Sequence, residues 1–186
     1  MALRPACLVV PLVCLLAPLS ASAERPEPRR DPKGITGISP FWERVARADR
    51  AVLARDYDSA LALYREAIVE KPEEPLGHYR VGALHTLKGN LKDAELAYQT
   101  ALRLADKSAA FKAKLLFLLG DLFERQAAFE PAVAHYEACE GLSSDSKASH
   151  FAASASERKR RILAWQKQRA DSAAVQERIA NGPSKN

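Results

Sequence analysis

The chain has 186 residues, of which 47% are apolar and 27% are charged. This length suits one ordinary domain rather than two, and the composition is that of a folded, soluble protein. The net charge of +5 is mild for this length and says more about solubility than about partners. A nucleic-acid-binding protein would carry basic residues clustered on one face with aromatic residues among them, and the only dense basic cluster is at 158–161.

The first predicted element is a secretory signal peptide over residues 1–23. Arg4 supplies a positive start, residues 6–19 are almost wholly apolar, and Ala21 and Ala23 are the small residues that signal peptidase requires. The apolar run of roughly 14 residues is shorter than the ~20 that a membrane-spanning helix needs, although retention as an uncleaved anchor stays open. We therefore expect an exported protein, periplasmic in a bacterium, or secreted or in the ER lumen in a eukaryote.

Cleavage after Ala23 would leave Cys139 as the last of the three cysteines. A single cysteine cannot form an internal disulfide, so we expect Cys139 to be a small buried side chain, with a reactive thiol as the alternative. Lipid attachment at Cys14 is not expected, because the preceding Val13 is not the small residue that lipoprotein processing requires.

Residues 24–38 are predicted to form a disordered linker. Pro26, Pro28 and Pro32 alternate with charged residues, and no apolar periodicity appears. Order is expected to begin at Ser39-Pro40, because serine caps the free amides of a helix and proline suits its first position.

From residue 41 onward the chain repeats. A small residue, a tyrosine and a second small residue recur at Ala60, Tyr64 and Ala67, at Ala94, Tyr98 and Ala101, and at Ala132, Tyr136 and Cys139. The first two copies are 34 residues apart (Ala60 to Ala94), and the third follows after 38. We assign the four extra residues to 106–110, between helices. A period of this length indicates stacked pairs of antiparallel helices.

Each repeat divides into two helices of similar length. The predicted helices are 41–54, 57–70, 76–88, 91–104, 112–126 and 129–140, which make repeats at 41–74, 75–108 and 113–145 within a domain at 39–145. Residues 146–186 form a capping helix and tail, because Phe151, Ala155, Ile162 and Trp165 share one helical stripe. Asn181-Gly182-Pro183 is a helix stop.

The repeat resembles the tetratricopeptide repeat family. The second unit has Gly82, Gly89, Ala94, Tyr98 and Ala101 in the family's expected places. The first unit departs from the pattern with Ala48 and Ala51, and the third carries Cys139 at its last small position. The resemblance implies an all-α fold, a right-handed superhelical stack of three hairpins with a C-terminal capping helix. It also implies a non-enzymatic, protein-binding role.

The small residues predict where the two helices of each hairpin cross. We expect contacts between Gly82 and Ala94, between Gly120 and Ala132, and between Ala48 and Ala60. The tyrosines of the repeat are expected to fill space between one hairpin and the next.

In tetratricopeptide proteins the first helices of the repeats line a concave groove, and the resemblance places candidate partner-binding residues there. These are Trp42, Val45, Asp49, Tyr79, Ala83, Thr86, Phe117, Asp121 and Glu124. Trp42 and Phe117 have a second interpretation, in which they complete the core. The lysine and asparagine that grip a partner's terminal carboxylate in some family members are absent, because Val45 and Asp49 stand at those positions.

No enzyme chemistry is indicated. The four histidines lack metal-ligand spacing, and no phosphate-binding loop or activated serine motif appears. We expect no cofactor, no metal and no small-molecule substrate. Arg158 to Arg161 is either a solvated helix face or a weak contact for an anionic surface.

The sequence thus favours an adaptor or scaffold of the bacterial cell envelope that binds a protein or peptide in its groove. The alternative is a self-associating structural subunit of an envelope machine, such as one for motility or secretion. A homo-oligomer is compatible with both.

Overall fold

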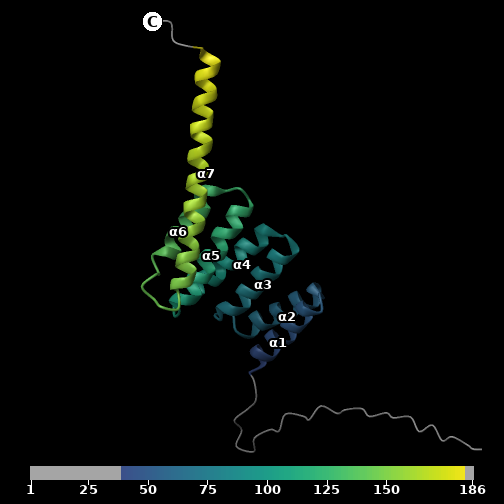
Figure 1. Cartoon of the computed structure of the whole chain (residues 1–186). Coiled ribbons are helices and arrows are strands. Elements are labelled where there is room, and N and C mark those ends of the chain that lie inside the picture. The colour runs from purple at the N-terminus through teal and green to yellow at the C-terminus, as the bar shows by residue number, and fades with distance from the viewer. Residues whose placement is uncertain (1–38, 183–186) are drawn as a thin grey trace, which may run out of the picture. The chain divides into compact units, whose positions relative to one another are not determined.

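The computed structural model describes residues 39–182, which form one compact unit. The predicted signal peptide, the linker at 24–38 and residues 183–186 lie outside the described residues. The described part contains α1 (Pro40–Leu53), α2 (Tyr57–Glu70), α3 (Pro75–Lys88), α4 (Leu91–Leu104), α5 (Ala109–Arg125), α6 (Phe129–Glu140) and α7 (Ser149–Asn181), and no strand (Figure 1). The predicted all-α stack of three helical hairpins with a C-terminal helix is confirmed.

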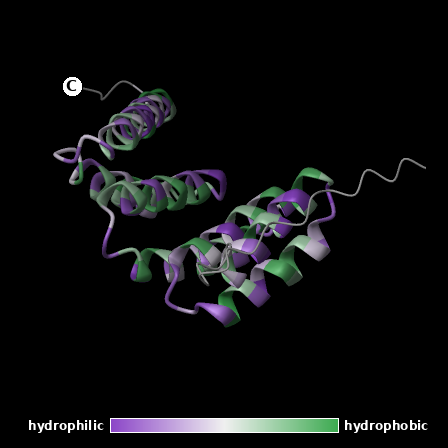
Figure 2. Ribbon diagram, turned by 90° about the horizontal axis from the view of Figure 1, so that it is seen from below, coloured by the Kyte–Doolittle hydropathy of each residue, from purple (hydrophilic) through white to green (hydrophobic). Residues whose placement is uncertain are grey.

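The helices pair and stack in chain order. The closest pairs are α1 with α2, α3 with α4, and α5 with α6, and each hairpin then contacts the next through α2 with α3 and α4 with α5. Hydrophobic and hydrophilic residues interleave along these helices (Figure 2), so each helix has an apolar side to bury. Three clusters of buried side chains result: one in the first hairpin with Leu84 of α3, one between α4 and α5, and one in the third hairpin with α7.

The three turns within the hairpins use the same backbone conformation at equivalent positions. Arg55, Gly89 and Ala127 have φ angles of 61°, 77° and 57°. Glycine adopts this left-handed region without cost, whereas a side chain there is disfavoured by about 1–2 kcal/mol. Of the three residues, Gly89 in the second turn is therefore the one best suited to this conformation.

We expect Ala127→Gly to raise the free energy of unfolding by about 0.5–1 kcal/mol, because it relieves the left-handed strain at some cost in chain entropy. Gly89→Ala should lower the same quantity by about 1 kcal/mol. Ala62→Gly, on an exposed helical position of α2, is the matched control and should be destabilising. Urea unfolding measures all three. The interpretation of the turn fails if Ala127→Gly destabilises as Ala62→Gly does.

The closest approach within each hairpin differs from the predicted one. A Cβ added to Gly82 would lie 2.6 Å from Cδ1 of Tyr98, and one added to Gly120 would lie 2.5 Å from Cε1 of Tyr136. The predicted partners Ala94 and Ala132 are fully buried, but the atoms nearest to each glycine belong to the tyrosine ring. The rings of Tyr98 and Tyr136 thus lie directly over the glycine of their own hairpin, where no side chain is in the way. As predicted, they also pack toward the next element, because Tyr98 clusters with buried leucines of α5 and Tyr136 with Ala155 and Ile162 of α7.

Helix α5 begins three residues earlier than predicted. The side chain of Ser108 accepts a hydrogen bond from the backbone N–H of Phe111 at 3.3 Å, so it caps a helix that starts at Ala109. Part of the insertion assigned to the loop at 106–110 is therefore helical. Ser39 precedes α1 as predicted, but its side chain makes no capping hydrogen bond.

Helix α7 divides into a packed half and an exposed half. Its buried residues are Ala152, Ala155 and Ile162, which face α6 and α5. Residues 167–181 are all exposed, and Figure 1 shows this half extending past the hairpins. The helix stops at Gly182, whose φ is 68°, at the predicted position. Within residues 39–182, no helix is long and apolar enough to cross a membrane.

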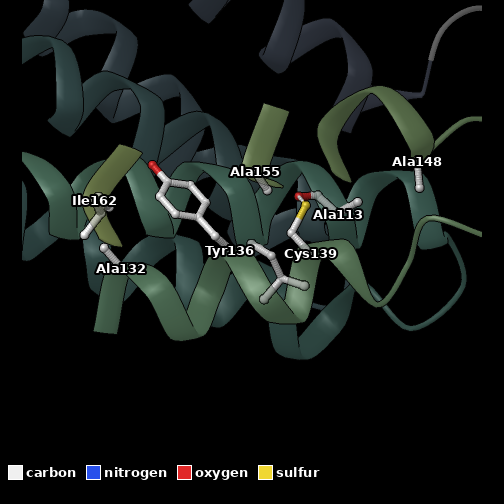
Figure 3. Packing of buried hydrophobic residues seen from close by; sticks show 8 residues of the cluster. Ala113, Ala132, Tyr136, Cys139, Ala148, Ala155 and Ile162 are labelled. Carbon is white, nitrogen blue, oxygen red and sulfur yellow. Dashed lines mark hydrogen bonds between the residues drawn. The ribbon is translucent and has the colours of Figure 1, made fainter. Parts of the chain in front are cut away.

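Cys139 lies in the core of the third hairpin, as predicted. It is 0% exposed, and its thiol donates to the carbonyl oxygen of Ala113 at 3.3 Å. Figure 3 shows the sulfur directed toward Ala113, with Tyr136 farther along the same helix. Burial, with a smaller contribution from Glu140, raises the pKa of the thiol to about 11.

We therefore expect Cys139 to resist alkylation in the folded protein. At pH 8 a thiol of such a pKa should react with iodoacetamide about 100-fold or more slowly than an ordinary cysteine, because only the thiolate is nucleophilic. Mass spectrometry of the Cys139 peptide, before and after unfolding in urea, measures this. Equal labelling in both conditions would show that the third hairpin opens readily.

Candidate functional site

The first helices of the hairpins contact one another along one side, and α7 continues the row. We call this surface the first-helix face. It is formed by contacts from α1 to α3, from α3 to α5 and from α5 to α7, through the following residues: Asp49, Tyr79, Arg80, Lys114, Phe117, Asp121, Glu124, Phe151 and Arg158.

An ion pair joins α1 to α3. A guanidinium nitrogen of Arg80 lies 3.0 Å from a carboxylate oxygen of Asp49, and both side chains are about one third exposed. The other carboxylate oxygen of Asp49 accepts a hydrogen bond from the hydroxyl of Tyr64. Burial, followed by this hydrogen bond, raises the pKa of Tyr64. The carboxylate thus links both helices of the first hairpin to the second hairpin.

Tyr79 is the aromatic centre of the face. Its ring stacks on Tyr98 with centroids 6.2 Å apart and meets Phe111 of α5 edge-on at 5.6 Å. The ammonium group of Lys114 lies 4.3 Å from the centre of the same ring, a distance at which a cation is attracted to an aromatic face. The half-buried Tyr79 therefore has a positive charge over its ring.

Helix α7 packs against the part of the face that α5 contributes. Arg158 reaches back from α7 to Asp121 at 3.3 Å and to Glu124 at 3.1 Å. Glu124 also accepts a hydrogen bond from the hydroxyl of Tyr136 at 2.9 Å. Burial, followed by this hydrogen bond, raises the pKa of Tyr136. The acidic end of the face is therefore largely neutralised within the molecule.

The predicted groove residues fall into three groups. Trp42 is 46% exposed, and Val45 is 3% exposed, so the expectation that Val45 is open to a partner is wrong: it packs in the core of the first hairpin. Asp49, Tyr79, Ala83 and Thr86 are half-buried on α1 and α3. Phe117, Asp121 and Glu124 meet α7.

Thr86 has a structural role besides its place on the face. Its hydroxyl donates to the carbonyl oxygen of Gly82 at 2.9 Å and lies 3.2 Å from the hydroxyl of Tyr98. Glu124 occupies the equivalent place beside Tyr136 in the third hairpin. The first hairpin has Val52 there, which offers no polar group, and the hydroxyl of Tyr64 donates to Asp49 instead.

Arg80, Phe151 and Arg158 of the face were absent from the predicted set, and so was Phe111, which meets Tyr79. Arg80 directly follows Tyr79, which is in the predicted set. Its pairing with Asp49 depends on how α1 and α3 stack, which a local sequence pattern does not show. Phe111 precedes the predicted helix 112–126, but it lies inside α5, which begins at Ala109. Ser108, a residue type that favours the N-cap, is the sequence signal that indicates this earlier helix start.

The basic run 158–161 is not a free basic patch. Arg158 pairs with Asp121 and Glu124, Lys159 with Glu137 and Glu140, and Arg160 with Glu157. Within the described residues only Arg161 of the four has no ion pair. Little unpaired positive charge therefore remains in this run for contact with an anionic surface.

A pocket of about 380 Å³ opens at the N-terminal ends of the first helices. Its apolar wall consists of Trp42 from α1, Pro75 and Leu76 from α3, and Leu104 and Phe111 from α4 and α5. Glu73, Glu74 and Lys107 lie in the two loops that border it. Phe111 also contacts Tyr79 of the first-helix face, so one residue borders both. No group of three or more potential metal ligands is found among residues 39–182.

Comparison with known proteins identifies the fold. The stress-induced protein-1 N-terminal domain from C. elegans superposes with a TM-score of 0.54 at 14% identity, covering 64% of this chain and 99% of that chain. The type III secretion translocator chaperone SycD of Yersinia enterocolitica (alternative dimer) gives 0.61 at 11%, covering 70% and 96%. The Sgt2 TPR domain from Aspergillus fumigatus gives 0.53 at 15%, covering 81% and 90%.

The fold is tetratricopeptide-like. No family model matches the sequence, and no curated protein matches it. At these identities the shared feature is the stack of helical hairpins.

Proposed function

We propose that this protein is a non-enzymatic scaffold that binds a protein or peptide partner on its first-helix face. The observation that carries the proposal is the run of partly exposed residues from Trp42 through the apolar pocket to Tyr79 and Lys114. Soluble proteins seldom leave aromatic and aliphatic residues together at an accessible pocket unless they bind something there. Protein binding also agrees with the fold, whose solved examples include a chaperone.

Energetics favour a short segment of the partner as the main contact. Burying one large apolar side chain contributes on the order of 1.5–3 kcal/mol, and a few such anchors account for most of the affinity of a typical interface. The pocket and the ring of Tyr79 supply two neighbouring places for anchors. The ion pairs of Asp49 and Arg158 hold the surrounding helices in position.

The proposed setting is the bacterial cell envelope. It rests on residues 1–23, whose positive start, apolar run and Ala21–Ala23 cleavage site have the pattern of an export signal. Intact-mass measurement of the exported protein tests it: we expect a chain that begins at Glu24, and a chain that begins at Met1 would contradict the proposal.

Self-association is the second candidate, and the exposed half of α7 favours it. Val175 and Ile179 of this half are 53% and 74% exposed, and Trp165, just before it, is 41% exposed. The three residues lie close to one helical stripe. Two copies could bury these residues against each other. Light scattering of the whole protein and of a Val175→Glu/Ile179→Glu variant decides this: a dimer that the variant loses supports it, and a monomer in both excludes it.

Site-specific photo-crosslinking tests partner binding. A benzophenone amino acid replaces Tyr79, or replaces Leu96, which is 64% exposed on α4 away from the face. We expect a discrete adduct from position 79 in the cells that make the protein, and none from position 96. Adducts at 96 alone, or equal adducts at both, would place the partner elsewhere.

A further inference from the structure

The pocket at the N-terminal ends of the first helices differs from the rest of the face in its charge. Its floor is apolar, from Trp42, Leu76 and Phe111, whereas its border carries the carboxylates of Glu73 and Glu74 against the single ammonium group of Lys107. The carboxylates stand together in the loop before α3, and Lys107 stands in the loop before α5. One side of the pocket mouth is therefore negative.

We propose that this pocket binds a large apolar side chain of the partner that has a lysine or arginine beside it in sequence. The inference rests on the proposed function and specifies the chemistry of its partner. The apolar side chain fills the space between Trp42 and Phe111. The neighbouring cation lies against Glu73 and Glu74.

The size of the pocket suits one anchor residue. Its volume of about 380 Å³ is at the low end of the range for small-molecule sites, which runs from roughly 300 to 1,000 Å³. A Trp, Phe or Leu side chain with its adjoining backbone fits such a space. The exposed ring of Trp42 also attracts a cation that passes over its face.

An anionic occupant fits less well, for two local reasons. The helix that begins at Pro75 has no N–H at its first position, because proline lacks one. At the start of α5 the N–H of Phe111 already donates to Ser108. The two helix ends that border the pocket thus offer fewer free amides to a carboxylate than helix ends usually do, and the carboxylates of Glu73 and Glu74 repel it.

The position of the pocket also sets the direction of the partner. Phe111 forms the pocket wall on one side and meets Tyr79 at 5.6 Å on the other. A segment anchored in the pocket therefore continues over Tyr79 toward Lys114. Acidic or aromatic residues in that part of the partner would meet the ammonium group that lies 4.3 Å from the ring centre.

Tryptophan fluorescence with matched peptides tests the proposal. The chain has two tryptophans, so the Trp165→Phe variant makes Trp42 the sole reporter. Three soluble Gly-Ser peptides are titrated, with Phe-Arg, Phe-Glu or Ala-Arg at the centre. We expect a saturable change in Trp42 emission with Phe-Arg, with a Kd in the millimolar range or tighter. Binding of the other two should be at least tenfold weaker.

A second variant assigns the charge preference. Glu73→Gln/Glu74→Gln keeps the size of both side chains and removes no capping hydrogen bond, since Glu74 makes none. It should remove the preference for Phe-Arg over Phe-Glu and retain the preference for Phe-Arg over Ala-Arg. No response to Phe-Arg, or an equal response to all three peptides, overturns the proposal.

The peptide titration and the crosslinking at position 79 can succeed or fail independently of each other. If position 79 crosslinks a partner but the peptides show no preference, partner binding stands and the anchor chemistry is wrong. If the peptides show the preference but position 79 captures nothing, the pocket binds as proposed and the partner does not extend over the first-helix face.

Discussion

Replacement of Gly120 by valine is expected to lower the free energy of unfolding by about 1–3 kcal/mol, which is the usual cost of overpacking a core. The Cβ alone would lie 2.5 Å from the ring of Tyr136, and the hydroxyl of that ring is held by Glu124. The ring cannot move away without giving up this hydrogen bond and its packing against α7. Thermal and urea unfolding measure the loss.

The alanine variant gives the sharper test, because two effects oppose each other in sign. In an exposed helix Gly→Ala stabilises by about 0.8–1 kcal/mol. At Gly120 we expect Gly120→Ala to destabilise, since even a methyl group meets the ring. Gly141 is the matched control: a Cβ there would approach the carbonyl oxygens of Ala138 and Glu137 at ordinary distances of 3.4 and 3.8 Å. Gly141→Ala should be neutral or stabilising. If both variants stabilise, the contact between Gly120 and Tyr136 is wrong.

The second large effect is expected for Arg158→Glu. This change removes two ion pairs and places a third carboxylate beside Asp121 and Glu124, which are only 17% and 21% exposed. Breaking a fully buried pair costs about 3–5 kcal/mol, and an exposed pair less than about 1. For these partly buried groups we expect a loss of about 2 kcal/mol, smaller at high salt.

Arg161→Glu is the control for this variant. It makes the same change in charge one turn along α7, at an exposed position without an ion pair among the described residues, and should cost less than about 0.5 kcal/mol. Hydrogen exchange locates the effect, since we expect faster exchange over residues 149–162 in Arg158→Glu before the first two hairpins are affected. Equal stability of the two variants would mean that Arg158 does not fasten α7 to α5.

The hairpins were predictable because the repeat encodes them locally. Tyr64, Tyr98 and Tyr136 recur at nearly constant spacing, and each helix end has its own signal, such as Gly89 in the second turn. These patterns depend on residues a few positions apart. For this reason the helix bounds from sequence agree with the structure, except at α5, where Ser108 capped a longer helix than expected.

The site was less predictable because it depends on distances between helices. Arg158 reaches Asp121 and Glu124 across 37 and 34 residues, and nothing in the basic run indicates which residue turns inward. Val45 is buried although the family resemblance predicts an exposed position, because the first unit departs most from the family pattern. The pocket combines two loops that lie about 30 residues apart in the sequence, so no local motif describes it.

The most direct test of partner binding at the first-helix face is calorimetric titration of the segment captured at position 79. Ala83→Glu is the decisive variant, because it adds a side chain to a half-exposed position of α3 without removing the packing that Tyr79 provides. Leu96→Glu, on the exposed side of α4, is its control. We expect Ala83→Glu to weaken binding at least tenfold, or about 1.4 kcal/mol, with helicity unchanged, and Leu96→Glu to bind as the original protein does. Unchanged affinity in folded Ala83→Glu, with loss in Leu96→Glu, would contradict the account and place the partner on the second helices.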